Sequence, residues 1–322
     1  MIKKQNVKVG FLLAMLTAIM WGLVPIAMKS ALIVIDPYTV AWYRFVMSAF
    51  GLTVWLKYKK QLPNLAIFKR PKRLVLLFMA GLFLMGNFTF FASGVQYLSA
   101  TTSQVVAQLG IVVFMIASTI IFKERLRPTQ IVGIGVLIIG LILFFNENLK
   151  ELFSNLSEYG IGVWLGFFGA ISWAIYAIAQ KILLKKLRAE QLLWLIYLIC
   201  TVLLLPFATP TKIMQADLLQ LSALIFCGFN TIIAYGALVA AMERWQAAQV
   251  SAITTLTPLF ALLFSDLFAF IWPQYFMMQP LNLIGYVGAF TVVCGAMFAT
   301  IGHQIWHHRK GLLLNRNKEE FK

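Results

Sequence analysis

Two prolines fall inside long apolar stretches, where each leaves a backbone carbonyl without its usual helical donor. Proline has no N–H, so in helices Pro25 frees the carbonyl of Trp21 and Pro258 frees the carbonyl of Thr254. A free carbonyl beside an indole, as at Trp21, suits a hydrogen bond from a substrate amine. The alternatives are a packed kink at Pro25 and threonine hydroxyls near Pro258 that bond back to their own helix.

Amide side chains are the second group with chemical potential in these stretches. Gln104 and Gln108 are four positions apart, so they share one face of a helix, and Gln249 stands at a corresponding place later in the chain. Asn87 and Asn230 occupy similar depths in two further stretches. We expect these amides to line a binding cavity, with hydrogen bonds between neighbouring helices as the alternative.

A third stretch combines aromatic and polar side chains on one face. Trp173, Tyr176 and Gln180 recur at helical spacing and predict a stripe suited to binding a small molecule. Packing against another helix is the alternative for such a stripe. With the groups above, the candidate binding residues are Trp21, Asn87, Gln104, Gln108, Trp173, Tyr176, Gln180, Asn230, Gln249 and Thr254.

Arg44 and Asp266 are charged residues inside apolar stretches. A charge at membrane depth is costly unless it faces a cavity or a partner, so the two form a candidate ion pair or coupling site. The alternative is structural, with Arg44 extending its head group outward and Asp266 satisfied near the rim. All three histidines lie at or beyond the last apolar stretch, at His303, His307 and His308.

The elements that must position these residues are membrane-spanning helices. Hydrophobic residues make up 61% of the 322 residues and charged residues 12%, far from the average soluble domain. Apolar runs of about twenty residues can cross a hydrocarbon core of about 30 Å, and lipid-facing backbone requires helix. The sequence predicts an all-α integral membrane protein with ten transmembrane helices at residues 10–28, 37–56, 74–96, 100–122, 128–145, 160–180, 190–207, 217–240, 247–272 and 281–302.

The net charge of +16 follows from membrane topology and does not indicate a nucleic-acid partner. Lysine and arginine gather in alternate loops and at both termini, which predicts that both termini are cytoplasmic. The basic stretch 1–9 precedes an apolar run that is long for a signal peptide and lacks a clear cleavage site, so we expect a retained first helix. Short outer loops favour a bacterial inner membrane, and the lipid bilayer is the predicted environment.

The chain contains an internal repeat. Residues 10–29 align with 162–181, including Trp21 with Trp173 and Lys29 with Lys181, and two later pairs of stretches align in the same order. We predict a first five-helix repeat at 1–147, an extracytoplasmic linker at 148–159, a second repeat at 160–302 and a basic cytoplasmic tail at 303–322. Since five is odd, the repeats are inverted, an arrangement typical of secondary transporters.

On these features the sequence resembles the drug/metabolite transporter superfamily, in its ten-helix EamA-type branch. The motifs that carry the resemblance are MWGLVPIAMK at 20–29, SWAIYAIAQK at 172–181, WYRF at 42–45, FKERL at 122–126 and TPLFALLF at 257–264. The resemblance implies a central cavity surrounded by helices one, three, four, six, eight and nine, which hold all ten candidate binding residues. Where relatives often carry an acidic GE-type motif at the end of helix nine, this chain has Asp266 in SDLFAFIWPQ, which leaves that motif's role in doubt.

Several classes of function are excluded or disfavoured. No Walker-type loop is present, so this chain alone does not use ATP. Cys200, Cys227 and Cys294 lie in separate spans, which disfavours disulfides and metal binding, and we expect no cofactor. An enzyme is disfavoured because no histidine lies inside the membrane. The resemblance implies that small four-helix relatives exchange protons by means of a glutamate in the first helix. This chain has no carboxylate in its first helix. We therefore favour a facilitator or exchanger over a proton-coupled antiporter.

The resulting hypothesis is export of a small metabolite, an amino acid or a related compound, by alternating access. A neutral cavity rich in amides and aromatic rings suits a small zwitterion. Uptake of a quaternary amine or another nutrient is the alternative, since aromatic faces bind such cations, and a membrane scaffold is a remote one. The expected partners are a small-molecule substrate and lipid, with the protein treated as a monomer.

Overall fold

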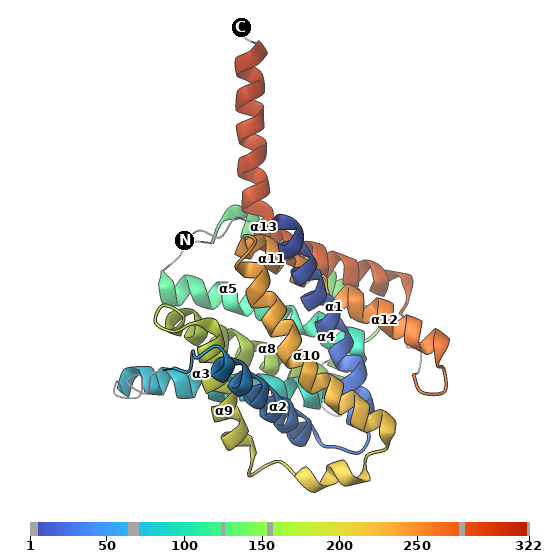
Figure 1. The fold of residues 1–322 in the computed structure, drawn as a ribbon. Helices are drawn as coiled ribbons and strands as arrows, with labels where there is room; N and C mark the ends of the chain where they lie inside the picture. The colour runs from blue at the N-terminus through green and yellow to red at the C-terminus, as the bar shows by residue number, and fades with distance from the viewer. Residues whose placement is uncertain (1–5, 64–70, 124–125, 153–156, 277–280, 321–322) are drawn as a thin grey trace.

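The structure is a computed structural model that describes residues 6–63, 71–123, 126–152, 157–276 and 281–320. Every regular element in this described part of the chain is a helix. The helices pack into one bundle, from which the C-terminal helix projects (Figure 1). The predicted linker 148–159 and the motif at 122–126 lie partly outside the described residues.

The first half of the chain forms six helices, and capping residues explain where several of them begin. Asp36 caps the second helix and Ser99 the fourth, each accepting a hydrogen bond from a backbone N–H three residues on, and Pro37 follows Asp36 at a position that needs no N–H. The helices are α1 (Val7–Ala31), α2 (Pro37–Tyr58), α3 (Pro71–Tyr97), α4 (Ala100–Ala107), α5 (Leu109–Phe122) and α6 (Pro128–Phe144).

The second half follows the short helix α7 (Leu149–Leu152). Asp217 begins its long central helix through reciprocal bonds with Gln220, in which each side chain accepts from the other residue's backbone N–H. The elements are α8 (Glu158–Leu183), α9 (Ala189–Leu204), the 3₁₀ helix η2 (Pro210–Gln215), α10 (Leu218–Met242), α11 (Ala247–Thr254), α12 (Thr257–Ile271) and α13 (Leu283–Glu320).

The predicted all-α membrane fold with about ten spans is confirmed. Helices α6 and α9 are apolar but shorter than the other spans, and α2 has 22 residues but carries Arg44 and Lys57. The seven helical stretches long and apolar enough to cross a membrane are Val7–Ala31, Pro71–Tyr97, Ala100–Phe122, Glu158–Leu183, Leu218–Met242, Gln249–Ile271 and Leu283–Gly302.

The fourth span of each half is a broken helix, which the sequence prediction missed. The first break falls at Gln108, between α4 and α5, and the second at Thr255 and Leu256, between α11 and α12. At both breaks the backbone switches to bonds between residues three apart, including Gln108 N–H to Val105 C=O (3.1 Å) and Leu256 N–H to Ile253 C=O (3.1 Å). The two breaks therefore occupy corresponding places in the two repeats.

The halves are interleaved rather than placed side by side. Helix α1 packs on α10 and α12 of the second half, and α8 packs on α3 and α5 of the first half. Each half therefore supplies its first helix to the core of the other, as expected for repeats related by a two-fold axis. The inverted orientation of the two halves in the membrane stays a prediction.

The same symmetry appears where α2 and α9 cross. The indole N–H of Trp42 donates to the carbonyl of Thr201 (3.1 Å), and that of Trp194 donates to the hydroxyl of Thr53 (2.7 Å). Each tryptophan thus binds the other half of the chain. This crossing belongs to a buried core of α2, α3, α8 and α9.

Glycines bring α6 and α13, the last helices of each half, into close contact. A Cβ added at Gly133 would overlap the backbone of Ala299, and one at Gly140 would overlap the backbone of Val292. Gly288 and Gly295 of α13 make the reciprocal contacts with Phe144 and Leu137 of α6. This agrees with a packing role for Gly133 and Gly140, whereas a Cβ at Gly135 would meet no atom within 4 Å.

The last helix differs from its predicted end. Helix α13 does not end near residue 302 but continues to Glu320, and its last part leaves the bundle (Figure 1). No proline follows Pro280, so no proline interrupts the helix beyond residue 302. The predicted tail at 303–322 is thus helical as far as the structure describes it, and the cytoplasmic side of both termini stays a prediction.

Candidate functional site

Amide side chains bond the backbone of α1 to both halves of the bundle. The amide nitrogen of Gln104 in α4 donates to the carbonyl of Trp21 (2.8 Å), the carbonyl that Pro25 frees. The amide nitrogen of Asn230 in α10 donates to the carbonyl of Met20. The carbonyl proposed to receive a substrate amine is thus already bonded inside the protein.

Asn87 makes the corresponding bond in the other half. Its amide nitrogen donates to the carbonyl of Gly169 in α8 (2.9 Å). Asn87 on the third span and Asn230 on the eighth therefore each reach the first span of the opposite half. For Asn87, Gln104 and Asn230 the structure shows the hydrogen bonds between helices that the sequence offered as the alternative.

The carbonyl freed by Pro258 is also occupied. The hydroxyl of Thr257 donates to the carbonyl of Thr254 (2.7 Å), and the hydroxyls of Thr254 and Thr255 donate to carbonyls three residues earlier. These threonines bond back to their own helix, which was the alternative for this segment. Pro258 itself lies in the first turn of α12, where its missing N–H costs little.

Seven buried side-chain oxygens have no hydrogen-bond partner in the described part of the chain, and four of them belong to amide and tyrosine side chains on spans of the two halves. These four are the amide oxygens of Gln108 and Asn230 and the hydroxyls of Tyr176 and Tyr197. Unpartnered buried polar atoms are rare in native proteins because each costs about 1–3 kcal/mol. Gln108 is also the residue at the break between α4 and α5, so the break and an unpartnered acceptor coincide.

Arg44 is buried on α2 and points into the bundle between the halves. Its side-chain Nε donates to the hydroxyl of Thr231 in the middle of α10 (3.1 Å). Its guanidinium carbon lies 4.4 Å from the ring centroid of Phe88 in α3, a cation–π contact. Tyr197 and Tyr235 are close enough to interact electrostatically with the guanidinium.

The candidate pair of Arg44 and Asp266 does not form. Asp266 instead accepts a hydrogen bond from the hydroxyl of Tyr286 (3.3 Å), at an exposed position on α12. Arg44 is bonded to α10 and buried, so it does not extend outward either. Asp266 therefore has a hydrogen-bond partner on α13, and its depth in the membrane stays a prediction.

The remaining candidates lie in three settings. The rings of Trp21 and Tyr235 meet edge to face (centroids 5.4 Å apart), and Tyr235 is one of the residues that interact with Arg44. Trp173 contacts Phe114 of α5 instead (6.1 Å). Gln180 lies near the last turn of α8 and Gln249 near the first turn of α11, so both sit toward helix ends.

Four residues near Arg44 were absent from the candidate list derived from sequence. They are Phe88, Tyr197, Thr231 and Tyr235, which the structure places around Arg44. Tyr235 lies four residues after Thr231 on α10, so the two share a face of that helix, which is the signal in the sequence that links them. Nothing in the sequence marks Phe88 among 27 phenylalanines.

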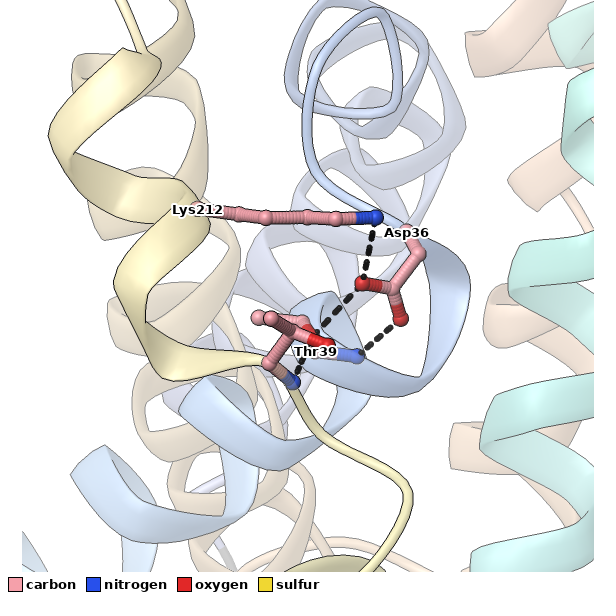
Figure 2. Close-up of polar contacts among 4 residues, drawn as sticks. Asp36, Thr39 and Lys212 are labelled. Atoms are coloured by element: carbon pink, nitrogen blue, oxygen red, sulfur yellow. Dashed lines mark hydrogen bonds and ion pairs between the residues drawn. The ribbon is translucent and has the colours of Figure 1, made fainter.

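A polar clasp joins the two halves at the end of the bundle that holds η2 (Figures 1 and 2). Asp36 accepts hydrogen bonds from the backbone N–H (3.0 Å) and hydroxyl (2.8 Å) of Thr39, and pairs with the ammonium of Lys212 (3.3 Å). The Thr39 hydroxyl in turn accepts from the backbone N–H of Thr209 (2.7 Å). The start of α2 is thereby tied to the connection between α9 and α10.

This clasp is expected to weaken in acid. Burial raises the pKa of Asp36, but hydrogen bonds from Thr39 and the charge of Lys212 bring the pKa below its ordinary value. An acid with a lowered pKa stabilises the fold above its unfolded pKa of about 3.9, and this contribution is lost as the pH falls through the folded pKa. We expect Asp36→Asn, which keeps the helix cap, to melt below the unmodified protein at pH 7.

Thermal unfolding in detergent between pH 7 and pH 3 measures this difference. The gap between Asp36→Asn and the unmodified protein should shrink below about pH 4, because the aspartate then becomes neutral as well. Lys212→Gln serves as the matched variant on the other side of the pair. A gap that stays constant with pH would contradict the contribution of the charged pair.

Comparison with known proteins agrees with this architecture. The EamA-like transporter family matches residues 8–146 and 160–301, one match in each half. The uncharacterized inner membrane transporter YhbE of Escherichia coli K12 is 52% identical over 303 residues, covering 94% of each chain. A probable amino-acid metabolite efflux pump of Salmonella typhimurium is 26% identical, covering 79% of this chain and 85% of the pump.

A solved crystal structure supports the fold alone. It aligns with a TM-score of 0.62 at 17% identity and covers 92% of this chain and 98% of the other. The two family matches coincide with the two interleaved halves, and the relatives span nearly the whole chain. The chain therefore belongs to the EamA-like transporter family and is a multi-pass transporter of the inner membrane, not an enzyme.

Proposed function

We propose that this transporter exports a small zwitterionic metabolite, an amino acid or a related compound, by alternating access at the interface of its halves. The observation that carries the proposal is the pair of broken helices in corresponding spans. The break at Gln108 adjoins α4, and α4 packs on α12, which follows the break at Thr255 and Leu256. Broken helices at matching places in two repeats are typical of substrate sites in secondary transporters.

The chemistry of the groups near the interface supports a small polar substrate. The unpartnered oxygens of Gln108 and Asn230 are acceptors suited to an ammonium group, and the hydroxyls of Tyr176 and Tyr197 can donate or accept. A ligand that bonds to such atoms removes the cost of leaving them unsatisfied. The Salmonella relative described as a probable amino-acid metabolite efflux pump supports both the substrate class and the direction.

The proposed transport is not coupled to protons. Within the described residues, α1 carries no carboxylate, and Asp266 is bonded to Tyr286 at an exposed position. Proton coupling usually requires an ionisable group that faces the transport path. We therefore propose a facilitator or exchanger that follows the substrate gradient.

Uptake of a quaternary amine is the second candidate. The edge-to-face contact of Trp21 with Tyr235 favours it, because aromatic rings bind such cations. Competition by choline against a transported amino acid separates the two candidates. If choline inhibits transport and other amino acids do not, uptake of a quaternary amine is favoured.

The experiment for the proposed function is flux in proteoliposomes that are loaded with a panel of labelled amino acids. We expect saturable flux that is unchanged by an imposed pH gradient. Gln108→Ala removes a polar side chain at the break, so its flux should fall about three- to tenfold, the worth of one hydrogen bond. Gln215→Ala, at an exposed position on η2, is the matched control and should transport normally.

Two results would contradict this proposal in different ways. Flux that requires a pH gradient and disappears in Asp266→Asn would make the transporter proton-coupled through that acid. Flux no greater than that of empty liposomes for every compound of the panel would reject the substrate class.

A further inference from the structure

Arg44 is a buried cation without a carboxylate partner in the described part of the chain. Its side chain is 6% exposed, and its one hydrogen bond goes to the neutral hydroxyl of Thr231. Two other aspartates have partners of their own: Asp36 pairs with Lys212, and Asp266 is bonded to Tyr286. Burying an uncompensated charge costs free energy, and this cost is removed when an anion binds to the charged group.

The neighbours of the guanidinium leave one edge free for that anion. Nε is used by Thr231, and the ring of Phe88 lies 4.4 Å from the guanidinium carbon. No hydrogen bond of the two terminal nitrogens is found among the described residues. These two nitrogens form the fork that binds both oxygens of a carboxylate.

The other groups around Arg44 do not supply a negative charge, so they do not take the place of a carboxylate. Cys227, Tyr197 and Tyr235 interact electrostatically with the guanidinium, but thiols and phenols are ordinarily neutral near pH 7. The hydroxyl of Tyr197 is buried and unpartnered, so it has a proton available to donate. A carboxylate bound to Arg44 would supply the negative charge that these neutral groups lack.

We propose that Arg44 binds the carboxylate of the transported molecule and so selects substrates with a free carboxylate over amides, esters and quaternary amines. This inference rests on the proposed function, because it assumes that the central interface is the transport site. It also decides between the two candidate functions, since a fixed buried cation repels a quaternary amine. Trp21, which contacts Tyr235, then lies beside the carboxylate site rather than forming a cage for a cation.

The test compares each transported amino acid with its carboxamide in proteoliposomes. The carboxamide keeps the amino group and side chain but lacks the negative charge. For the unmodified protein we expect the carboxylate to be preferred at least about tenfold, the worth of one charge-assisted hydrogen bond. Arg44→Gln should lose flux of the acid and abolish the preference, whereas Arg44→Lys should retain part of it.

Two variants separate recognition from structure. Thr231→Val removes the hydrogen bond to Nε but keeps the charge, so the preference for the carboxylate should survive. Lys212→Gln removes a positive charge at the clasp and should leave the preference unchanged. If Arg44→Gln lowers the flux of acid and amide equally, or the unmodified protein carries both equally, the inference is overturned.

A binding readout keeps the inference testable if the proposed function fails. Thermal unfolding in detergent is measured with the panel acids, their amides, simple monocarboxylates and choline. Stabilisation by carboxylates that disappears in Arg44→Gln would support the inference even without amino-acid flux. Stabilisation or flux by choline but not by carboxylates, or no response to any carboxylate in either assay, would overturn it.

Discussion

Gly133→Ala is expected to destabilise the protein by about 1–3 kcal/mol, the usual cost of forcing an extra methyl group into a packed interface. The new Cβ would overlap backbone atoms of Ala299. Backbone cannot rotate away as a flexible side chain can, so α6 and α13 must separate. Thermal unfolding in detergent, followed by loss of the monodisperse peak, measures the effect.

Gly135→Ala provides a matched control two positions away on the same helix. A Cβ at Gly135 meets no atom within 4 Å, and alanine favours helix over glycine by about 1 kcal/mol. This variant should therefore match or exceed the stability of the unmodified protein. Gly295→Ala, which would overlap Leu137 from the other side of the crossing, should behave like Gly133→Ala. Equal stability of the Gly133 and Gly135 variants would show that the two helices separate freely.

Gln104→Leu is expected to destabilise the protein by about 1–2 kcal/mol, because it leaves a buried carbonyl without a donor. The acceptor is the carbonyl of Trp21, whose helical donor is missing because residue 25 is proline. Asn230→Leu should cost less. Its acceptor, the carbonyl of Met20, keeps the N–H of Val24 as helical partner, and the change also removes an unpartnered oxygen.

A double-mutant cycle tests the reason for this loss. Pro25→Ala restores an N–H four residues after Trp21, so Gln104→Leu should cost markedly less when Pro25→Ala is also present. Unfolding temperatures of the four proteins in one detergent give the coupling. Costs that are equal in both backgrounds would mean that the amide of Gln104 is not the substitute for the missing helical donor.

The sequence predicted the helices well because lipid imposes a simple rule on them. Each predicted span matches a helix or a pair of helices, since a long apolar run in a bilayer has to be helical. The free carbonyl of Trp21 was also predictable, because proline always lacks its N–H. What bonds to it was not predictable, since Gln104 arrives from another helix.

The central residues were harder to predict for the same reason. The break at Gln108 has no proline to mark it, unlike the break that Pro258 follows. Arg44 was identified as a costly charge, but its pairing with Thr231 depends on the interleaved packing of α2 and α10. A pattern along one helix shows which residues share a face, but it does not show which helix lies opposite.

The packing of each first helix on the other half also determines when α1 can reach its final packing during synthesis. Helix α1 is complete at Ala31, whereas α10, on which it packs, begins at Leu218. At about 5–20 residues per second, roughly 10–40 seconds pass before α10 is made. During that interval the hydroxyl of Thr17 can donate to the carbonyl of Leu13 in its own helix, but the carbonyl of Ala234 in α10 has not yet been synthesised. The nascent protein therefore reaches its final packing only near the end of synthesis, and a chain truncated before α10 lacks the main packing surface of α1.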